Sequence, residues 1–177
     1  MIYPKAQMKL PKDELLKKIR TVEDFPKPGV SFMDLNPLLG EGLLNHLTSY
    51  LAEEVADLDF DTVGCIEARG FIYGTALAQF MNKRIALLRK PGKLAPPVLK
   101  QSYTLEYGSD ALEMQRGSGK ILLVDDVLAT GGTLKAAAEL SQNSGYTVSA
   151  FAVIMDLKFL NKFEWNKLPV KSIFNIH

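Results

Sequence analysis

Residues 121–133 read ILLVDDVLATGGT, an apolar run that passes into two adjacent aspartates and then into a loop of small residues and glycines. The apolar run predicts a buried strand, and the pattern after the loop predicts a helix at 133–143. Ligands in open α/β sheets bind beyond the carboxyl ends of the strands. This segment is therefore well placed to form a binding site.

The loop after the aspartates is suited to a phosphate group. Its small residues leave backbone N–H groups accessible, it carries two hydroxyls, and it leads into a helix N-terminus. These residues are Ala129, Thr130, Gly131, Gly132 and Thr133. The alternative is a threonine that caps the helix and glycines that make a tight turn, but capping explains neither the pair of carboxylates nor the pair of glycines. Because Asp125 and Asp126 suit sugar hydroxyls, the whole segment indicates a phosphorylated ribose.

The same kind of apolar run recurs along the chain, with helix-like segments between the runs. The expected strands lie at 62–68, 84–89, 120–126 and 147–156, and the helices between them at 70–81 and 133–143. Near-continuous apolar runs are typical of strands buried on both faces of a mostly parallel sheet. The alternation predicts an α/β fold, with a mostly parallel central sheet flanked by helices.

The remaining segments complete a single domain over residues 1–177. Helices are expected at 12–20 and 43–55, and a turn of set shape at 25–29, FPKPG. Alternating polar and apolar residues at 98–119 predict a solvent-facing hairpin or flap, and 170–176 predicts an edge strand. There is no internal repeat or composition shift that would indicate a second domain.

Composition and charge exclude several classes of protein. The 177 residues include 21 basic and 20 acidic side chains, so a net charge of +1 gives no field for non-specific binding to nucleic acid or anionic membranes. The single cysteine, Cys65, excludes an internal disulfide and fits a reducing compartment. No apolar run approaches the ~18 residues of a membrane span, and the N-terminal segment lacks a secretory apolar region. We expect a cytoplasmic protein without nucleic-acid or membrane partners.

Two further segments carry candidate anion-binding groups. At 64–74, GCIEARGFIYG, a strand passes into the turn Glu67, Ala68 and Arg69, which would place the arginine beside the first N–H groups of a helix. At 89–97, RKPGKLAPP, three cations cluster around a proline and a glycine: Arg89, Lys90 and Lys93. Such a loop is either solvated surface or a contact for a polyphosphate, at this site or at that of a neighbouring subunit.

Taken in order and spacing, these motifs resemble the adenine phosphoribosyltransferases, a group within the type I phosphoribosyltransferases. The resemblance covers essentially the whole chain. It is carried by FPKPGVSFMDLNPLL (25–39), EARGFIYG (67–74), RKPGKL (89–94), SYTLEYGSDALEM (102–114) and VDDVLATGGT (124–133). The last motif is shared by type I enzymes in general, whereas FPKPGVSF and SYTLEYG are closer to the adenine enzymes. The resemblance implies a small hood at 1–36 and a mobile flap at 98–115.

The resemblance also implies a reaction and a set of donor contacts. The 5-phosphoribosyl group of 5-phosphoribosyl 1-pyrophosphate would pass to adenine, giving AMP and pyrophosphate, with Mg²⁺ held mainly through the substrate. Asp125 and Asp126 would hold the ribose hydroxyls, and residues 129–133 the 5-phosphate. Arg69, in the turn with Glu67 and Ala68, would contact pyrophosphate. In this family the basic loop with Arg89, Lys90 and Lys93 reaches pyrophosphate across a dimer interface, which implies a homodimer.

The base contacts and the flap pair are likewise implied by the resemblance. Phe32 would stack on adenine, Leu157 would contact the opposite ring face, and backbone groups around Ser31 and Met33 would contact the base edge. The family usually has arginine at position 33, so methionine removes a charged contact there. Glu106 and Tyr107 match the flap pair that closes over the reacting centre, where the glutamate would manage the proton on the purine ring.

Two other hypotheses stay open at this stage. A different 6-substituted purine would keep every donor residue and alter only the pocket around Phe32, Met33 and Leu157. Alternatively, the chain could be a non-catalytic sensor of the phosphorylated ribose. Such a sensor should carry a DNA-binding or partner module, and residues 1–24 are neither long nor basic enough to form one.

Overall fold

The computed structural model describes residues 9–25, 27–105 and 108–177. The chain divides into two compact units, one ending at His46 and the other beginning at Leu47. The predicted hood segment, 1–36, falls within the first unit.

The second unit is built on a five-stranded parallel sheet with the strand order β4-β3-β7-β8-β9. Its strands are β3 (Thr62–Ile66), β4 (Arg84–Leu88), β7 (Gly119–Leu128), β8 (Tyr146–Leu157) and β9 (Val170–Ile176). All five predicted strands are confirmed, and β9 lies at the predicted edge. Every residue of β3 is buried, as expected for a strand covered on both faces.

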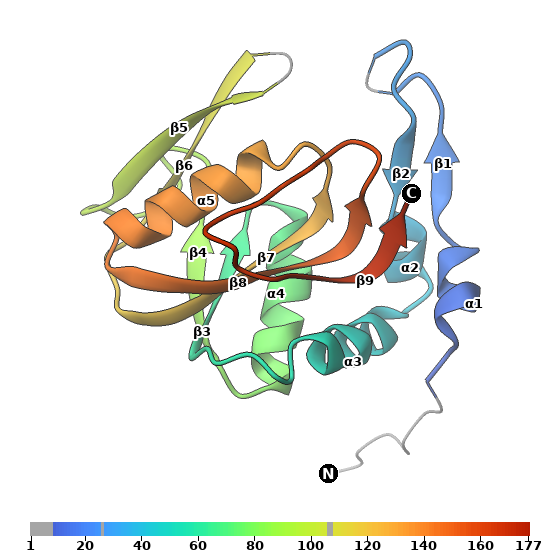
Figure 1. Cartoon of the computed structure of the whole chain (residues 1–177), viewed down its shortest axis with the longest axis horizontal. Helices are drawn as coiled ribbons and strands as arrows, with labels where there is room; N and C mark the ends of the chain where they lie inside the picture. The colour runs from blue at the N-terminus through green and yellow to red at the C-terminus, as the bar shows by residue number, and fades with distance from the viewer. Residues whose placement is uncertain (1–8, 26, 106–107) are drawn as a thin grey trace. The chain divides into compact units, whose positions relative to one another are not determined.

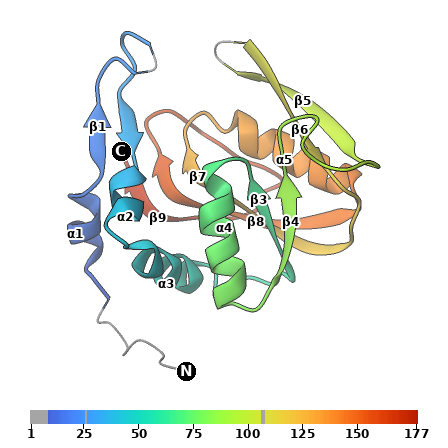
Figure 2. The same cartoon turned by 180° about the vertical axis from the view of Figure 1, so that it is seen from behind.

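The second unit contains most of α3 (Leu44–Glu54) and all of α4 (Arg69–Phe80) and α5 (Gly132–Asn143). Helix α4 packs against β3, β4 and β7, and α5 packs against β7 and β8. Figures 1 and 2 show α4 on one face of the sheet and α5 on the other. The predicted α/β fold is therefore confirmed.

The strand order reverses between β3 and β7. The connection through α4 leads from β3 outward to β4, whereas the connection through α5 leads from β7 in the opposite direction to β8. Right-handed crossovers in opposite directions place the two helices on opposite faces of the sheet. The carboxyl ends of β3 and β7 therefore border a topological switch point, the usual place for a ligand in such folds.

A hairpin stands apart from this sheet. Strands β5 (Leu99–Leu105) and β6 (Gly108–Met114) pair antiparallel, confirming the hairpin predicted at 98–119. The hairpin packs against α5, where the amide of Gln101 donates a hydrogen bond to Glu139 over 2.9 Å (Figure 1). A backbone bridge between Arg89 and Glu113 joins β6 to the segment that follows β4.

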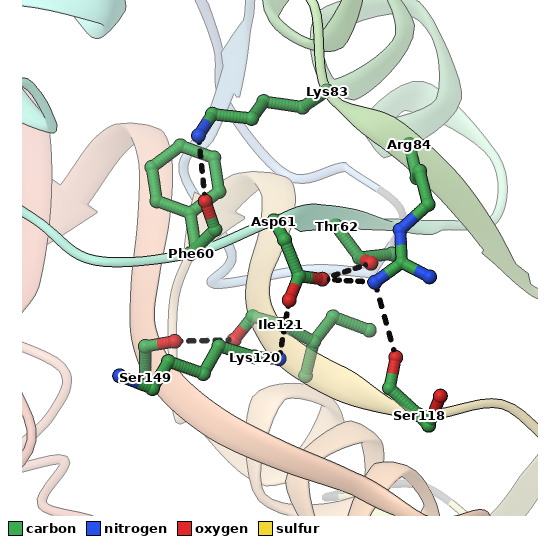
Figure 3. A network of polar contacts seen from close by, with 9 residues as sticks. All are labelled: Phe60, Asp61, Thr62, Lys83, Arg84, Ser118, Lys120, Ile121 and Ser149. Atoms are coloured by element: carbon green, nitrogen blue, oxygen red, sulfur yellow. Dashed lines mark hydrogen bonds and ion pairs between the residues drawn. The ribbon is translucent and has the colours of Figure 1, made fainter.

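Polar contacts tie together the amino ends of β3, β4 and β7 (Figure 3). The Asp61 carboxylate accepts hydrogen bonds from the Thr62 hydroxyl at 2.7 Å and the Lys120 amide at 3.1 Å, and it pairs with Arg84. These three contacts, the Thr62 hydroxyl first, lower the pKa of Asp61 to about 2. This network fastens the end of the sheet opposite the switch point.

The first unit contains a small antiparallel sheet that the sequence analysis missed. Its elements are α1 (Lys12–Leu16), β1 (Arg20–Val22), β2 (Phe32–Asp34) and α2 (Asn36–Gly40). The helix predicted at 12–20 ends at Leu16, so its second half is wrong. Arg20 instead pairs with Asp34 on the neighbouring strand, over 2.7 Å between side-chain atoms. Strand pairing outweighs the weak helical pattern at this position.

Hydrogen bonds link described residues of the turn between β1 and β2. The amide of Gly29 donates to the Asp24 carboxylate over 2.7 Å, and the amide of Phe25 donates to the backbone oxygen of Val30 over 3.1 Å.

In the described ranges of the chain, no helix is both long and apolar enough to cross a membrane.

Candidate functional site

A cavity of about 300 Å³ lies at the carboxyl ends of β3 and β7, beside the switch point. It brings together residues from all three motifs that the sequence analysis singled out. The predicted residues that line it are Glu67, Ala68, Arg69, Lys90, Asp125, Asp126 and Thr133. Tyr103 and Asp110, from the hairpin, also line it and were not predicted.

An ion pair joins the two strand ends across the switch point. Arg69 is the first residue of α4, and its Nε donates to Oδ2 of Asp126, which lies near the end of β7. The amide of Asp126 donates to Oδ1 of Asp125 over 2.9 Å. The carboxylates and the guanidinium therefore form one connected polar group.

Burial gives this group unusual electrostatics. The pKa of Asp125 is raised well above its ordinary value, first by burial and then by the charge of Asp126. Burial alone would lower the pKa of Arg69, but the carboxylates of Asp126 and Asp125 raise it overall. Arg69 thus stays charged, and a ligand with hydroxyl groups would relieve part of the repulsion between the aspartates by donating hydrogen bonds.

A glycine allows the two strand ends to approach this closely. A Cβ atom on Gly70 would lie 2.7 Å from the backbone oxygen of Val124 and 3.1 Å from the Cα of Asp125. Only a residue without a side chain fits between the first turn of α4 and the backbone of β7. The Arg-Gly pair in the motif EARGFIYG therefore places Arg69 beside Asp126.

The predicted phosphate loop lies next to this cavity. Strand β7 continues two residues past the aspartates, to Leu128, and the loop then leads directly into α5 at Gly132. A second cavity, of about 170 Å³, is lined by residues 127–134. Thr133 lines both cavities, so a single ligand could extend from the loop to the carboxylates. The N-terminus of α5 supplies N–H groups and a positive dipole end there.

Gly131 gives the loop its shape. Its φ of +88° lies in the left-handed region, where a side chain is strained. A Cβ at this position would also lie 2.6 Å from Cδ2 of Phe163. Phe163 in turn packs edge-on against Phe151 of β8, with ring centroids 5.0 Å apart. The aromatic ring therefore supports the loop from behind, a role that no sequence pattern indicated.

The basic loop is held by Glu67 at its beginning. Oε2 of Glu67 accepts hydrogen bonds from the amide of Lys90 at 2.9 Å and from Nε of Arg89 at 3.1 Å. Burial raises the pKa of Glu67, but these two residues lower it overall, so the group is a carboxylate. Arg89 also donates to the backbone oxygen of Lys93 over 3.2 Å. The ammonium group of Lys90 reaches the cavity and pairs there with Asp110.

The predicted base-binding residues belong to different units. In the first unit, Phe32 packs edge-on against Phe25 at 5.3 Å, the Ser31 hydroxyl donates to Glu23 over 3.1 Å, and the Thr21 hydroxyl lies 3.6 Å from Sδ of Met33.

In the second unit, Leu157 is the buried last residue of β8. Its backbone oxygen accepts a hydrogen bond of 2.8 Å from Asn161. The predicted flap pair, Glu106 and Tyr107, lies outside the described residues.

Known proteins resemble this chain in sequence and in fold. A family model described as "Phosphoribosyl transferase domain" matches residues 39–172. An adenine phosphoribosyltransferase of Bdellovibrio bacteriovorus is 44% identical over 161 residues, covering 90% of this chain and 98% of that protein. The adenine phosphoribosyltransferase of Gloeobacter violaceus is 46% identical over 153 residues. This match covers 84% of this chain and 90% of that protein.

Solved structures show the same similarity. The crystal structure of an adenine phosphoribosyltransferase of Thermoanaerobacter pseudethanolicus superposes with a TM-score of 0.85 at 33% identity. The superposition covers 94% of this chain and 100% of that chain. The Giardia lamblia enzyme, solved in complex with 9-deazaadenine, gives a TM-score of 0.84 at 29% identity. The superposition covers 95% of this chain and 99% of that chain.

Proposed function

This chain belongs to the adenine phosphoribosyltransferases, within the phosphoribosyl transferase domain family, and we infer that it transfers the 5-phosphoribosyl group of 5-phosphoribosyl 1-pyrophosphate to adenine. The products are AMP and pyrophosphate, a purine salvage reaction. The observation that carries this function is the carboxylate pair of Asp125 and Asp126 at the switch point. It faces Arg69 on one side and adjoins a glycine loop at a helix N-terminus on the other.

The donor would occupy both cavities at once. Its 5-phosphate would lie in the loop formed by Ala129, Thr130, Gly131, Gly132 and Thr133, where backbone N–H groups and hydroxyls can donate to it. Its ribose hydroxyls would donate to Asp125 and Asp126 in the adjoining cavity. Thr133 lines both cavities, which supports a placement in which one donor molecule extends from the first cavity into the second.

The cations on the other side of the cavity would hold the pyrophosphate. In the reaction, the bond between the anomeric carbon and a pyrophosphate oxygen breaks, and a bond to N9 of adenine forms. The electron pair leaves with pyrophosphate, so negative charge grows on it. Arg69 and Lys90 in the cavity, with Arg89, Lys93 and the backbone of Glu67 and Ala68 nearby, would stabilise that charge. Asp125 and Asp126 would favour the positive charge that develops on the sugar.

The acidic groups of the cavity fit a magnesium ion that is held mainly by the substrate. In the described part of the chain, no group of three or more His, Cys, Asp or Glu side chains is arranged to hold a metal. The acidic side chains Glu67, Asp110 and Asp126 each contact a basic residue already. Mg²⁺ commonly uses one or two carboxylates together with substrate phosphates and waters, which suits this arrangement. When bound, it would neutralise charge on the leaving pyrophosphate.

The acceptor contacts would be those that the family resemblance implies. Phe32 would stack on one face of adenine and Leu157 would contact the other, with backbone groups of Ser31 and Met33 at the base edge. Glu106, with Tyr107 beside it, would take up the purine proton as the new bond forms. A site that hydrogen-bonds the exocyclic amine should reject 6-oxopurines, because unpaired buried polar groups are costly.

A homodimer is supported by the exposed face of β4 and α4. Ile85 and Leu87 of the edge strand β4 are 45% and 39% exposed, and Ile72 and Phe80 of α4 are exposed as well. Large exposed side chains on an open strand edge are typical of an interface. The basic loop follows β4 directly, so a partner that covered β4 would lie close to Arg89, Lys90 and Lys93.

The buried free thiol of Cys65 supports a reducing, cytoplasmic location.

The proposed function is tested by measuring AMP formation from adenine and the donor, with and without Mg²⁺, and with hypoxanthine and guanine in parallel. Metal-dependent product from adenine alone is the expected result. Product from another 6-substituted purine but not from adenine would identify that purine as the acceptor. Donor binding without product from any base would identify a sensor instead of an enzyme.

A double variant tests the observation on which the function rests. Asp125→Asn with Asp126→Asn should abolish donor binding in isothermal titration, because both acceptors for the ribose hydroxyls lose their charge. Asp61→Asn is the matched control, since it removes a carboxylate at the other end of the same sheet. Normal donor affinity in the double variant would contradict the proposed donor site.

A further inference from the structure

Glu113 of β6 makes an unusual set of contacts with the basic loop. Its side chain is only 4% exposed. Oε1 accepts hydrogen bonds from the amides of Lys93 and Leu94, both at 2.8 Å, and Oε2 accepts one from the amide of Gly92 at 3.0 Å. Its backbone also exchanges two hydrogen bonds with Arg89, at 2.9 and 2.7 Å. One residue of the hairpin therefore holds both the start and the end of the loop.

Three consecutive amides that converge on one anion form a nest, a concave arrangement of N–H groups that binds negative charge. Gly92 permits this shape through its φ of +78°. The hydrogen bonds from the amides of Gly92 and Leu94 lower the pKa of Glu113, so its carboxylate stays charged. Because Glu113 already fills the nest, the amides of this loop are not available to a phosphate. Anion binding by the loop therefore falls to its basic side chains.

The loop is thus clamped by two carboxylates, one on each side of Pro91. Glu67 accepts the amide of Lys90 before the proline, and Glu113 accepts the amides that follow it. The clamp fixes the backbone from which the side chain of Lys90 extends into the cavity. Neither carboxylate oxygen of Glu113 needs to contact the donor for this effect.

We propose that Glu113 is a positioning residue for the pyrophosphate group, holding the loop in the shape that presents Lys90 and Lys93 to the donor. This role rests on the proposed function, in which those lysines stabilise the leaving group. Glu113→Gln is the decisive variant. It keeps the size of the side chain but places an NH₂ group, itself a donor, against at least one backbone N–H. The loop would then lose its anchor after Pro91.

The expected result is specific to the donor. The KM for 5-phosphoribosyl 1-pyrophosphate and the inhibition constant of pyrophosphate should both rise ~10-fold or more, because misplaced contacts to a reacting group carry penalties of this size. The KM for adenine should stay at the wild-type value. Asp61→Asn, which also removes a carboxylate that accepts a backbone amide, should lower the melting temperature and leave both pyrophosphate constants unchanged.

Two further measurements keep the proposal testable if Glu113→Gln folds poorly. Glu113→Asp keeps the charge on a shorter side chain, and it should give constants between those of wild type and the glutamine variant. In the wild-type protein, the amides of Gly92, Lys93 and Leu94 should exchange hydrogen slowly. Wild-type constants for donor and pyrophosphate in both Glu113 variants would overturn the proposal, as would rapid exchange of these amides in the wild type.

A binding measurement separates this role from the proposed function. Calorimetric titration with magnesium pyrophosphate measures the loop's contribution without requiring any transfer reaction. If the wild-type protein bound magnesium pyrophosphate but formed no AMP, the proposed function would fail. The comparison of Glu113→Gln with wild type would still decide the role of Glu113: weakened pyrophosphate binding supports it, and unchanged binding overturns it.

Discussion

Asp110 of β6 forms an ion pair with Lys90 of the basic loop, inside the cavity that also contains Asp125 and Asp126. The hydroxyl of Tyr103 donates to the same Asp110 oxygen over 3.3 Å. In the proposed reaction, Lys90 contacts the pyrophosphate of the donor. The carboxylate of Asp110 thus occupies, before the donor binds, a position next to the cation that the pyrophosphate requires.

Asp110→Asn should therefore strengthen donor binding. A partly exposed ion pair of this kind contributes about 0.2–1 kcal/mol, so releasing Lys90 should lower the KM for the donor by up to about 5-fold. Steady-state kinetics with the donor varied at saturating adenine would measure this. Asp59→Asn is a suitable control, because it breaks the exposed Asp59–Lys120 pair away from the cavity. An increased donor KM in Asp110→Asn would show that this carboxylate assists binding.

Asp125 should reduce the stability of the protein while it serves the reaction. Burial raises its pKa, so the folded state binds its proton more tightly than the unfolded state does. The stabilising contribution of such a group is fully present below the unfolded pKa, about 4, and is lost as the pH rises through the folded pKa. As the pH rises above about 4, the raised pKa of Asp125 therefore lowers the stability of the folded state.

Asp125→Asn should accordingly melt at a higher temperature than wild type, by about 2–4 °C near neutral pH, if the change in stability is ~1 kcal/mol. The amide oxygen can still accept the hydrogen bond from Asp126. The difference should shrink as the pH falls below about 4, where both proteins are uncharged at this position. Donor affinity should fall in the same variant. A lower melting temperature at neutral pH would mean that Asp125 is stabilised by its neighbours more than burial costs.

The thiol of Cys65 should react very slowly with alkylating agents in the folded protein. It lies in the buried strand β3, and burial raises its pKa to about 12. Only the thiolate reacts with alkylating agents, so near pH 8 its reactive fraction should be about 10³-fold below that of an ordinary cysteine. Alkylation by iodoacetamide, followed by mass spectrometry, should proceed in denaturant and not in buffer. Equal rates in both would show that β3 opens readily.

The parallel sheet and the centre of the site could be predicted because their signals are local. One apolar run ends three residues before Arg69, and another contains Asp125 and Asp126 near its carboxyl end, so the strands β3 and β7 place these side chains. Parallel strands end at the same edge of a sheet, which brings these residues together without any further information. The same reasoning correctly placed the glycine loop at the N-terminus of α5.

The residues that the sequence did not reveal act over long separations. Glu113 holds amides some twenty positions earlier, and Phe163 supports Gly131 from beyond β8. Neither position shows a pattern in its own neighbourhood, because an acidic residue in an alternating strand is ordinarily expected to face solvent. The pairing of Arg20 with Asp34 was missed for the same reason, since it joins two segments separated by a turn.

Gly131→Ala should damage the phosphate loop more than backbone strain alone predicts. The new Cβ would meet Phe163 at 2.6 Å in addition to the left-handed φ of +88°. Gly42→Ala is a matched control, because Gly42 has a φ of +74° and no atom within 4 Å of the Cβ position. Strain should cost about 1–3 kcal/mol in each variant, whereas only Gly131→Ala should also raise the donor KM, by ~10-fold or more. Chemical denaturation and steady-state kinetics on both variants separate these effects. An equal loss of stability in the two variants, with an unchanged donor KM, would show that the loop adapts to the methyl group and that Phe163 does not fix its shape.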